Sequence, residues 1–249
     1  PWGMLTGVRP GKLMTPLLAQ GLNDAQAARQ FERQYDVSPA RADLVVRTAH
    51  ATLRAMESLG SKDVCLYVGI PFCPTRCAYC SFVSQSVEKS MALVPEFLQA
   101  LAREIAATAE AVRRAGLRIV SLYIGGGTPT TLSARQLDAL CTQLAAAFDL
   151  SALREFTVEA GRPDTITADK LQVLRAHRVD RISVNPQTLD DRVLDTIGRR
   201  HTAQDIYDAL RLVRETGGFA VNMDLIAGLP GDTPDGFRAT LEQVLALAP

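Results

Sequence analysis

Three cysteines lie close together in the stretch Cys73-Pro-Thr-Arg-Cys77-Ala-Tyr-Cys80. Thiolates are soft ligands that suit iron–sulfur clusters and zinc, and three of them on one short loop can converge on a single metal centre. A cluster held by four cysteines is coordinatively closed, whereas three cysteines leave one iron open to another ligand. The spacing therefore indicates a [4Fe-4S] cluster at which a further molecule can bind and react.

A structural zinc site and a group of inert core cysteines are the alternatives. Zinc would usually require a fourth cysteine or histidine, and His50, His177 and His201 are all distant in the sequence. His177 and His201 are expected at the surface or at helix ends, and not as ligands. Cys65 and Cys141 fall in a predicted strand and a predicted helix, where we expect buried small apolar residues with no chemical role.

The cysteine loop follows the first segment of a repeating pattern. From about residue 61, short apolar runs alternate with longer segments of helical periodicity, which is typical of repeated βα units and a parallel sheet. The predicted strands span residues 64–70, 119–124, 156–159, 181–184 and 220–226. The predicted helices that follow them span residues 95–115, 134–148, 168–175, 202–215 and 234–247.

This pattern predicts an α/β fold, a partial (βα) barrel of five units over residues 61–249, preceded by an N-terminal helical segment over residues 1–60. In that segment the apolar residues recur with helical spacing, namely Ala42, Val46, Ala49, Leu53 and Met56. Functional groups of a parallel βα barrel gather at the carboxyl ends of its strands, which is where the cysteine loop falls. A sixth strand is expected beyond residue 249, so we expect the core to be truncated at its C-terminus.

The composition is that of an ordinary globular protein, since 47% of the 249 residues are hydrophobic and 22% are charged. Lys and Arg together number 27, as do Asp and Glu, so no net charge favours nucleic acid as a partner. No apolar run approaches the roughly 20 residues that a membrane helix needs. Five cysteines, three of them within eight positions, do not resemble a disulfide framework, and the segment after Pro1 has no secretory pattern, so we expect a reducing cytoplasm.

The C-x3-C-x2-C spacing, with the aromatic Tyr79 before the last cysteine, resembles that of radical S-adenosylmethionine (SAM) enzymes. The segments Tyr-Val-Gly-Ile-Pro-Phe, Val-Glu-Ala-Gly-Arg-Pro, Asn-Pro-Gln-Thr and Ile-Gly-Arg-Arg-His resemble the oxygen-independent coproporphyrinogen III oxidase family and its HemZ-type coproporphyrinogen dehydrogenase branch. The resemblance implies a radical SAM barrel that holds one or two molecules of S-adenosyl-L-methionine. An electron from a donor such as flavodoxin or ferredoxin would then generate a 5'-deoxyadenosyl radical, which an enclosed barrel protects from water and stray hydrogen donors.

The resemblance also implies which residues hold the cofactors. The cluster ligands are Cys73, Cys77 and Cys80, and no catalytic residue is assigned beyond the cluster and its cofactor. The positions that match cofactor contacts of the family are Tyr67, Tyr79, Gly126, Gly127, Thr128, Glu159, Gln187, Arg199 and Asp224.

Several of these positions also have a purely structural interpretation. The glycine run at 125–127 is compatible with an ordinary turn, although residues without side chains also let backbone groups approach a ligand closely. Glu159 is either an acceptor for ribose hydroxyls or a solvated loop acid, and Arg199 is either a cofactor contact or a surface partner of Asp195. Asp224 interrupts an apolar strand, where its carboxylate requires a polar ligand or an ion pair to offset its desolvation.

In the family that the chain resembles, the radical takes a hydrogen from a propionate side chain, and loss of carbon dioxide and of one further electron then leaves a vinyl group. We therefore predict a radical SAM oxidoreductase that acts on coproporphyrinogen III in porphyrin and haem biosynthesis. Two positions differ from the oxidases, because Phe82 stands in place of an additional cysteine and Gly69 in place of a histidine. Relatives that lack this cysteine include haem-binding proteins thought to act as chaperones. The alternative is therefore a haem-binding, chaperone-like protein that holds the cluster and SAM without oxidase activity.

Overall fold

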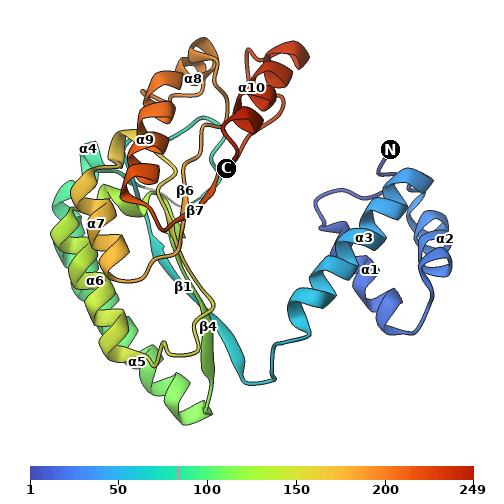
Figure 1. Ribbon diagram of the computed structural model, residues 1–249, viewed down its shortest axis with the longest axis horizontal. Helices are drawn as coiled ribbons and strands as arrows, with labels where there is room; N and C mark the ends of the chain where they lie inside the picture. Colours follow the sequence, from blue (N-terminus) through green and yellow to red (C-terminus); the bar gives the residue numbers. More distant parts are fainter. Residues whose placement is uncertain (83–84) are drawn as a thin grey trace. The chain divides into compact units, whose positions relative to one another are not determined.

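The computed structural model describes residues 1–82 and 85–249. The chain folds as two compact units, Pro1–Ser61 and Lys62–Pro249, and each has its own hydrophobic core. Figure 1 shows the first unit built of helices and the second built of a sheet with helices beside it. None of the helices in the described part of the chain is both long enough and apolar enough to cross a membrane.

The helices of the first unit are α1 Pro10–Ala19, α2 Asp24–Tyr35 and α3 Pro39–Met56. Pro10 and Pro39 occupy the first turns of α1 and α3, where a missing N–H breaks no helical hydrogen bond. A capping box starts α2, because the side chains of Asn23 and Gln26 each accept the backbone N–H of the other. The helices pack around the fully buried Phe31. The expectation of a helical N-terminal segment is confirmed.

A parallel five-stranded sheet forms the second unit, with the strands in the order β1-β4-β5-β6-β7. The strands are β1 Asp63–Ile70, β4 Arg118–Gly126, β5 Glu155–Glu159, β6 Arg181–Ser183 and β7 Ala220–Asn222. A separate pair of short strands, β2 Phe72–Cys73 and β3 Gln85–Ser86, brackets the cysteine loop. Parallel neighbours that follow one another along the chain, with helices between them, are the arrangement of a partial (βα) barrel.

The α-helices of this unit are α4 Val87–Ser90, α5 Val94–Ala115, α6 Ala134–Ala147, α7 Ala168–Ala176, α8 Asp191–Thr196, α9 Ala203–Thr216 and α10 Pro234–Ala246. Short 3-10 helices are η1 Met91–Leu93, η2 Pro129–Thr131 and η3 Pro163–Thr165. Figure 1 shows α5, α6 and α7 side by side along the sheet, with α9 next to α7. The fully buried Leu122, Val158 and Ile182 of the central strands pack with these helices in one core.

Polar side chains alternate with these buried residues and bond to one another across the strands. Tyr123 on β4 donates to Glu159 on β5 at 2.5 Å. Arg181 on β6 donates to Glu155 on β5 and to Asn222 on β7, each at 3.2 Å. Because successive residues of a strand point to opposite faces, these residues line the face opposite the helices.

The predicted strands and helices of the core are confirmed, with one substantial difference in length. β7 ends at Asn222 and does not continue to residue 226. Beyond Asn222 the pairing becomes irregular, with an isolated bridge between Gln187 and Leu225. Asp224 therefore lies outside the strand and is exposed, so the desolvation cost expected for its carboxylate does not arise.

The two cysteines that lie outside the cysteine loop differ from each other. Cys141 on α6 is buried as expected, and burial raises the pKa of its thiol to about 12. Cys65 on β1 is exposed, so the expectation of a buried residue is wrong there. The reason is the alternation of the strand, since Val68 and Ile70 enter the core and Cys65 takes the opposite face.

Candidate cluster and cofactor site

One pocket collects side chains from the ends of all five strands of the sheet and the loops that follow them. The predicted site residues that line it are Cys73, Cys77, Tyr79, Cys80, Gly126, Gly127, Thr128, Glu159, Gln187, Arg199 and Asp224. Tyr67 is the exception among the predicted residues. Its ring stacks on that of Tyr123 with centroids 5.8 Å apart, and it lines a neighbouring apolar pocket. The structure thus gathers the predicted residues at the carboxyl ends of the strands.

Backbone hydrogen bonds fix the cysteine loop. The N–H of Cys80 donates to the carbonyl of Cys77 at 3.1 Å, and the N–H of Ala78 donates to the carbonyl of Ile197 at 3.0 Å. Ile197 directly follows α8, so the loop is tied to the segment that follows β6. Among the described residues, no three His, Cys, Asp or Glu side chains converge as ligands of a single metal ion.

The glycine run packs directly against the cysteine loop. The N–H of Gly127 donates to the carbonyl of Ile70 at 2.8 Å, and the N–H of Thr128 donates to the carbonyl of Phe72 at 2.7 Å. Thr128 Oγ1 also donates to Cys73 Sγ at 3.5 Å. A Cβ at Gly127 would lie 2.6 Å from the oxygen of Phe72 and 3.0 Å from Cys73 Sγ. This close packing, and not turn formation alone, requires a glycine at 127.

Glu159 ends β5 with its carboxylate held from two sides. Tyr123 Oη donates to Oε1 at 2.5 Å, and the N–H of Gly126 also hydrogen-bonds to the carboxylate. Burial raises the pKa of Glu159, and the two hydrogen bonds oppose that rise because they stabilise the ionised form. Burial, together with the bond to Glu159, also raises the pKa of Tyr123. A carboxylate held in this way at the pocket wall is not a freely solvated loop acid.

Asn185 connects the segments that follow β6 and β7. Its Oδ1 accepts the N–H of Asp224 at 3.2 Å, and its carbonyl accepts a hydrogen bond from Arg199 Nη1 at 2.5 Å. Gln187 has a φ of 65°, which residues with side chains seldom adopt, and its N–H donates to the carbonyl of Asp224 at 2.9 Å. Asn222 Nδ2 donates to Asp224 Oδ1 at 2.9 Å. These bonds hold the Gln187 and Asp224 side chains at the pocket.

Two arginines and a histidine are buried close to the cysteine loop. Arg199 is 6% exposed and Arg162 is 3% exposed, so the interpretation of Arg199 as a surface partner of Asp195 is wrong. His201 is only 4% exposed, although it does lie at the start of α9, so a surface position is wrong for it too. Burial, followed by the charges of Arg199 and Arg162, lowers the pKa of His201 to about 4 and keeps the ring neutral. His177 directly follows the last residue of α7, so it lies at a helix end as expected.

The structure also places residues in the site that sequence reasoning did not single out. Arg162, Asn185 and Thr75 line the pocket, and Tyr123 holds Glu159. Their position in the sequence is the one signal that could have identified them, because Arg162 and Asn185 lie in the loops that follow β5 and β6. Their neighbours could not be read from the sequence, since these depend on how the loops pack.

Tyr79 joins the cysteine loop to a small apolar cluster of Val193, Leu194, Ile197 and Leu229. Burial raises the pKa of its hydroxyl to about 12, and the groups that hydrogen-bond to it are Cys77 and Arg199. Tyr79 therefore stands as a neutral hydroxyl between the thiol of Cys77 and the buried cation Arg199.

A parallel βα sheet that presents three thiols and several polar groups at the carboxyl ends of its strands defines an α/β protein able to hold a metal cluster beside a polar ligand. The family model of the radical SAM superfamily matches residues 67–244, and the chain belongs to that superfamily. The cofactors of the superfamily are a [4Fe-4S] cluster and SAM, so the expectation of both is confirmed. The donor set fits them, because three thiols line a pocket whose other walls carry polar groups for a further ligand.

The chain is similar to several curated proteins. It is 39% identical to the oxygen-independent coproporphyrinogen-III oxidase-like protein HemZ of Bacillus subtilis strain 168, over 100% of this chain and 50% of that protein. It is 36% identical to the heme chaperone HemW of the same strain, over 73% of this chain and 47% of that protein. The chain thus spans about half the length of these curated relatives.

Among solved structures, the coproporphyrinogen III oxidase HemN of Escherichia coli, a radical SAM enzyme, matches with a TM-score of 0.67 and 32% identity. The match covers 80% of this chain and 45% of HemN. This likeness confirms the predicted α/β fold with a partial radical SAM barrel. The relatives include both oxidases and chaperones, so they establish the superfamily and leave the reaction to be proposed.

Proposed function

We propose that the chain is the cluster-binding part of a cytoplasmic radical SAM oxidoreductase that decarboxylates the propionates of coproporphyrinogen III without oxygen. The observation that carries this proposal is the single pocket in which three thiols meet polar side chains from all five strands. The overall similarity to HemZ along the whole chain supports the choice of substrate class. The proposed partners are a tetrapyrrole substrate and an electron donor such as flavodoxin or ferredoxin.

The predicted site residues that line the pocket each have a proposed task. Cys73, Cys77 and Cys80 hold the cluster, which together with SAM supplies a hydrogen-abstracting radical when both are bound. Glu159 accepts hydrogen bonds from the ribose hydroxyls of SAM, and its ionised form is favoured by the donors around it. The other proposed cofactor contacts are Tyr79, Gly126, Gly127, Thr128, Gln187, Arg199 and Asp224.

Tyr67 does not line the cysteine pocket, and we propose that it lies where the substrate enters that pocket. The apolar pocket that it lines also contains Gly69 and Phe82 and shares Phe82 and Gly126 with the cysteine pocket. Tyr67 is 60% exposed and Phe82 is 66% exposed. Exposed aromatic rings beside a glycine can cover the flat apolar face of a tetrapyrrole.

The same surface favours a second candidate function, haem binding without decarboxylation. Phe82 stands where oxidases carry a cysteine, and heme chaperones are among the relatives of the chain. In this second function the aromatic surface binds haem, and the cluster and SAM remain bound without turnover of coproporphyrinogen.

A product assay under anaerobic conditions tests the first proposal. The protein is reconstituted with iron and sulfide and given coproporphyrinogen III, SAM and dithionite. We expect 5'-deoxyadenosine and carbon dioxide together. C80A should abolish both products because a cluster ligand is lost, whereas C65A, a cysteine outside the pocket, should retain them.

A cluster-loaded protein that forms neither product would contradict decarboxylation. A haem titration then tests the second function, which requires stoichiometric binding that weakens in F82A. A spectrum unchanged by haem would eliminate that function as well.

A further inference from the structure

Arg162 is a buried cation whose hydrogen-bonding capacity is incompletely used. Its Nη1 donates to Thr75 Oγ1 at 2.9 Å and to Cys77 Sγ at 3.9 Å, and its Nε donates to Asp164 Oδ1 at 3.3 Å. Its Nη2 is buried and has no hydrogen-bond partner among the described residues. Because a buried donor without an acceptor is costly, this group is suited to an acceptor that binds in the pocket.

The surroundings of Arg162 specify the charge of that acceptor. A guanidinium stays protonated at any pH that the protein tolerates, and Arg199 adds a second buried cation at the same pocket. The only carboxylate paired with Arg162 in the described structure, Asp164, is partly exposed and therefore screened by water. His201 adds no charge, because its lowered pKa keeps it neutral. The cysteine side of the pocket therefore favours bound groups with negative charge.

We infer that Arg162 donates hydrogen bonds to the sulfur atoms of the cluster held by Cys73, Cys77 and Cys80, and thereby raises its reduction potential. Reduction adds one electron to the cluster and transfers no proton or other group, so it adds one negative charge. A fixed cation in a pocket of low dielectric constant stabilises the reduced state more than the oxidised one. Hydrogen bonds to the sulfurs act in the same direction.

This inference rests on the proposed cluster but does not depend on the proposed reaction. The potential is measured without coproporphyrinogen, so a protein that fails to decarboxylate can still confirm it. A protein that takes up no iron would contradict the proposed cluster itself.

The alternative role for Arg162 is mechanical, since it could hold the cysteine loop through Thr75. Thr75 Oγ1 accepts from Arg162 and donates to the carbonyl of Gly198 at 2.9 Å. T75V removes this connection without changing any charge. It therefore separates a tether from an effect on the cluster.

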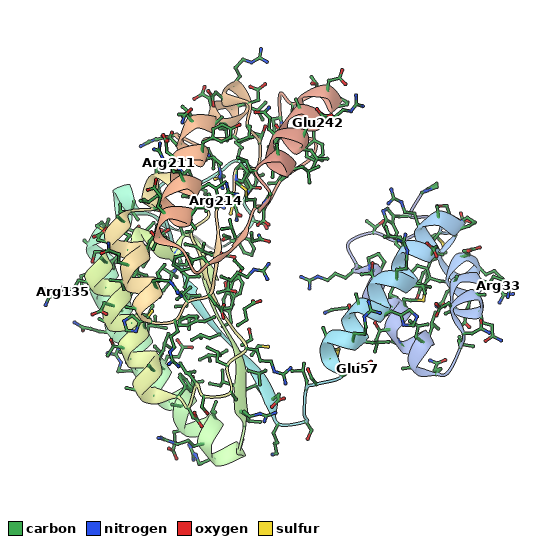
Figure 2. All side chains as sticks on the ribbon, viewed as in Figure 1. Arg33, Glu57, Arg135, Arg211, Arg214 and Glu242 are labelled. Atoms are coloured by element: carbon green, nitrogen blue, oxygen red, sulfur yellow. The ribbon has the colours of Figure 1, made fainter. Side chains whose placement is uncertain are left out.

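The test is a redox titration of the reconstituted protein with dithionite, followed by electron paramagnetic resonance of the reduced cluster. R162Q is compared with R135Q, a control at an exposed arginine on α6 that points away from the fold (Figure 2). We expect R162Q to lower the reduced-to-oxidised ratio about tenfold at a fixed potential, a shift of about 59 mV for a one-electron couple. R135Q should titrate like the unaltered protein, and T75V should shift the potential less than R162Q does.

Iron analysis accompanies each titration. If R162Q takes up less iron, R162K is titrated in its place, because lysine keeps the positive charge and lacks the several N–H donors of the guanidinium group. We then expect a smaller shift in the same direction. An unchanged potential in a cluster-loaded R162Q or R162K would overturn the inference, as would an equal shift in T75V.

Discussion

Among single residues, Glu159 is a carboxyl group whose ionisation is affected in opposite directions by burial and by hydrogen bonds. Burial raises the pKa of its carboxyl group, and the hydrogen bonds from Tyr123 and from the N–H of Gly126 oppose the rise. The proposed contact with ribose hydroxyls favours the ionised form, because only that form accepts on both oxygens without restriction. If Glu159 makes the proposed contact, Tyr123 is a positioning residue that acts on the cofactor through Glu159.

Y123F removes the hydroxyl that donates to Glu159 and leaves the ring in place. We expect the affinity for SAM to fall about five- to tenfold, the equivalent of one net hydrogen bond of about 1 kcal/mol. The loss should grow as the pH falls, because the pKa of Glu159 rises further. Calorimetric titration of the reconstituted protein at two pH values measures this effect. Y207F, which loses a hydroxyl bonded to Gln243 on the surface, is the matched control. Equal affinities for the two variants would contradict the role of Tyr123.

His201 predicts a dependence of stability on pH. Its pKa is about 4 in the folded protein and about 6.5 when unfolded, so between these values only the unfolded chain binds the proton. Stability is therefore retained above pH 6.5 and lost as the pH falls toward 4, by about 2 kcal/mol between pH 7 and pH 5. Urea unfolding of the metal-free chain, followed by circular dichroism, measures the loss. H201Q should lose less over the same interval, and an identical loss in both proteins would refute the assignment.

The sequence identifies the thiols and most pocket residues because each follows a strand, and parallel strands end at one edge of a sheet. It does not identify Tyr123 or Arg162, whose importance comes from contacts with Glu159 and Cys77 across different strands and loops. Burial was equally hard to predict. His201 stands at a helix start that suggests exposure, yet the surrounding segments enclose it.

Among the secondary-structure elements, those with strong periodicity were predicted nearly to the residue. The α5 helix begins at Val94, one residue before the predicted start, and ends at the predicted Ala115. β7 is shorter than predicted because its apolar pattern continues past the point where its pairing with β6 becomes irregular. The hydrophobic pattern of a segment indicates which side chains can be buried. It does not indicate where the backbone stops pairing with the neighbouring strand.

The loop after β4 packs against the cysteine loop, and a substitution at Gly127 tests whether this packing positions Cys73. G127A places a Cβ 2.6 Å from the oxygen of Phe72 and 3.0 Å from Cys73 Sγ, so the loop must move away from the cysteines. We expect a loss of about 1–3 kcal/mol in unfolding free energy and less iron bound per chain. Urea unfolding and iron analysis measure the two effects. G11A on α1 is the control, because its added Cβ meets only ordinary contact with Thr48 Cγ2 at 3.7 Å. Normal iron content in G127A would show that the loop does not position Cys73.

At the scale of the whole molecule, the two units have main hydrophobic cores that share no member among the described residues. One core belongs to the helices of Pro1–Ser61, and another lies between the sheet and helices of Lys62–Pro249. All pocket residues belong to the second unit. A change in the first core should therefore leave the pocket intact, because the described buried residues of the two cores do not overlap.

F31A tests this separation, since Phe31 is fully buried in the first core. Removing the ring should cost that unit about 3–5 kcal/mol. Trp2, the single tryptophan of the chain, packs against the same core, so its fluorescence reports on this unit alone. We expect the fluorescence transition in urea to move to lower concentration while the iron content after reconstitution stays unchanged. L122A changes a fully buried residue of the second core. It should lower the iron content and leave the fluorescence transition unchanged. Loss of iron in F31A would show instead that the two units fold as one cooperative structure.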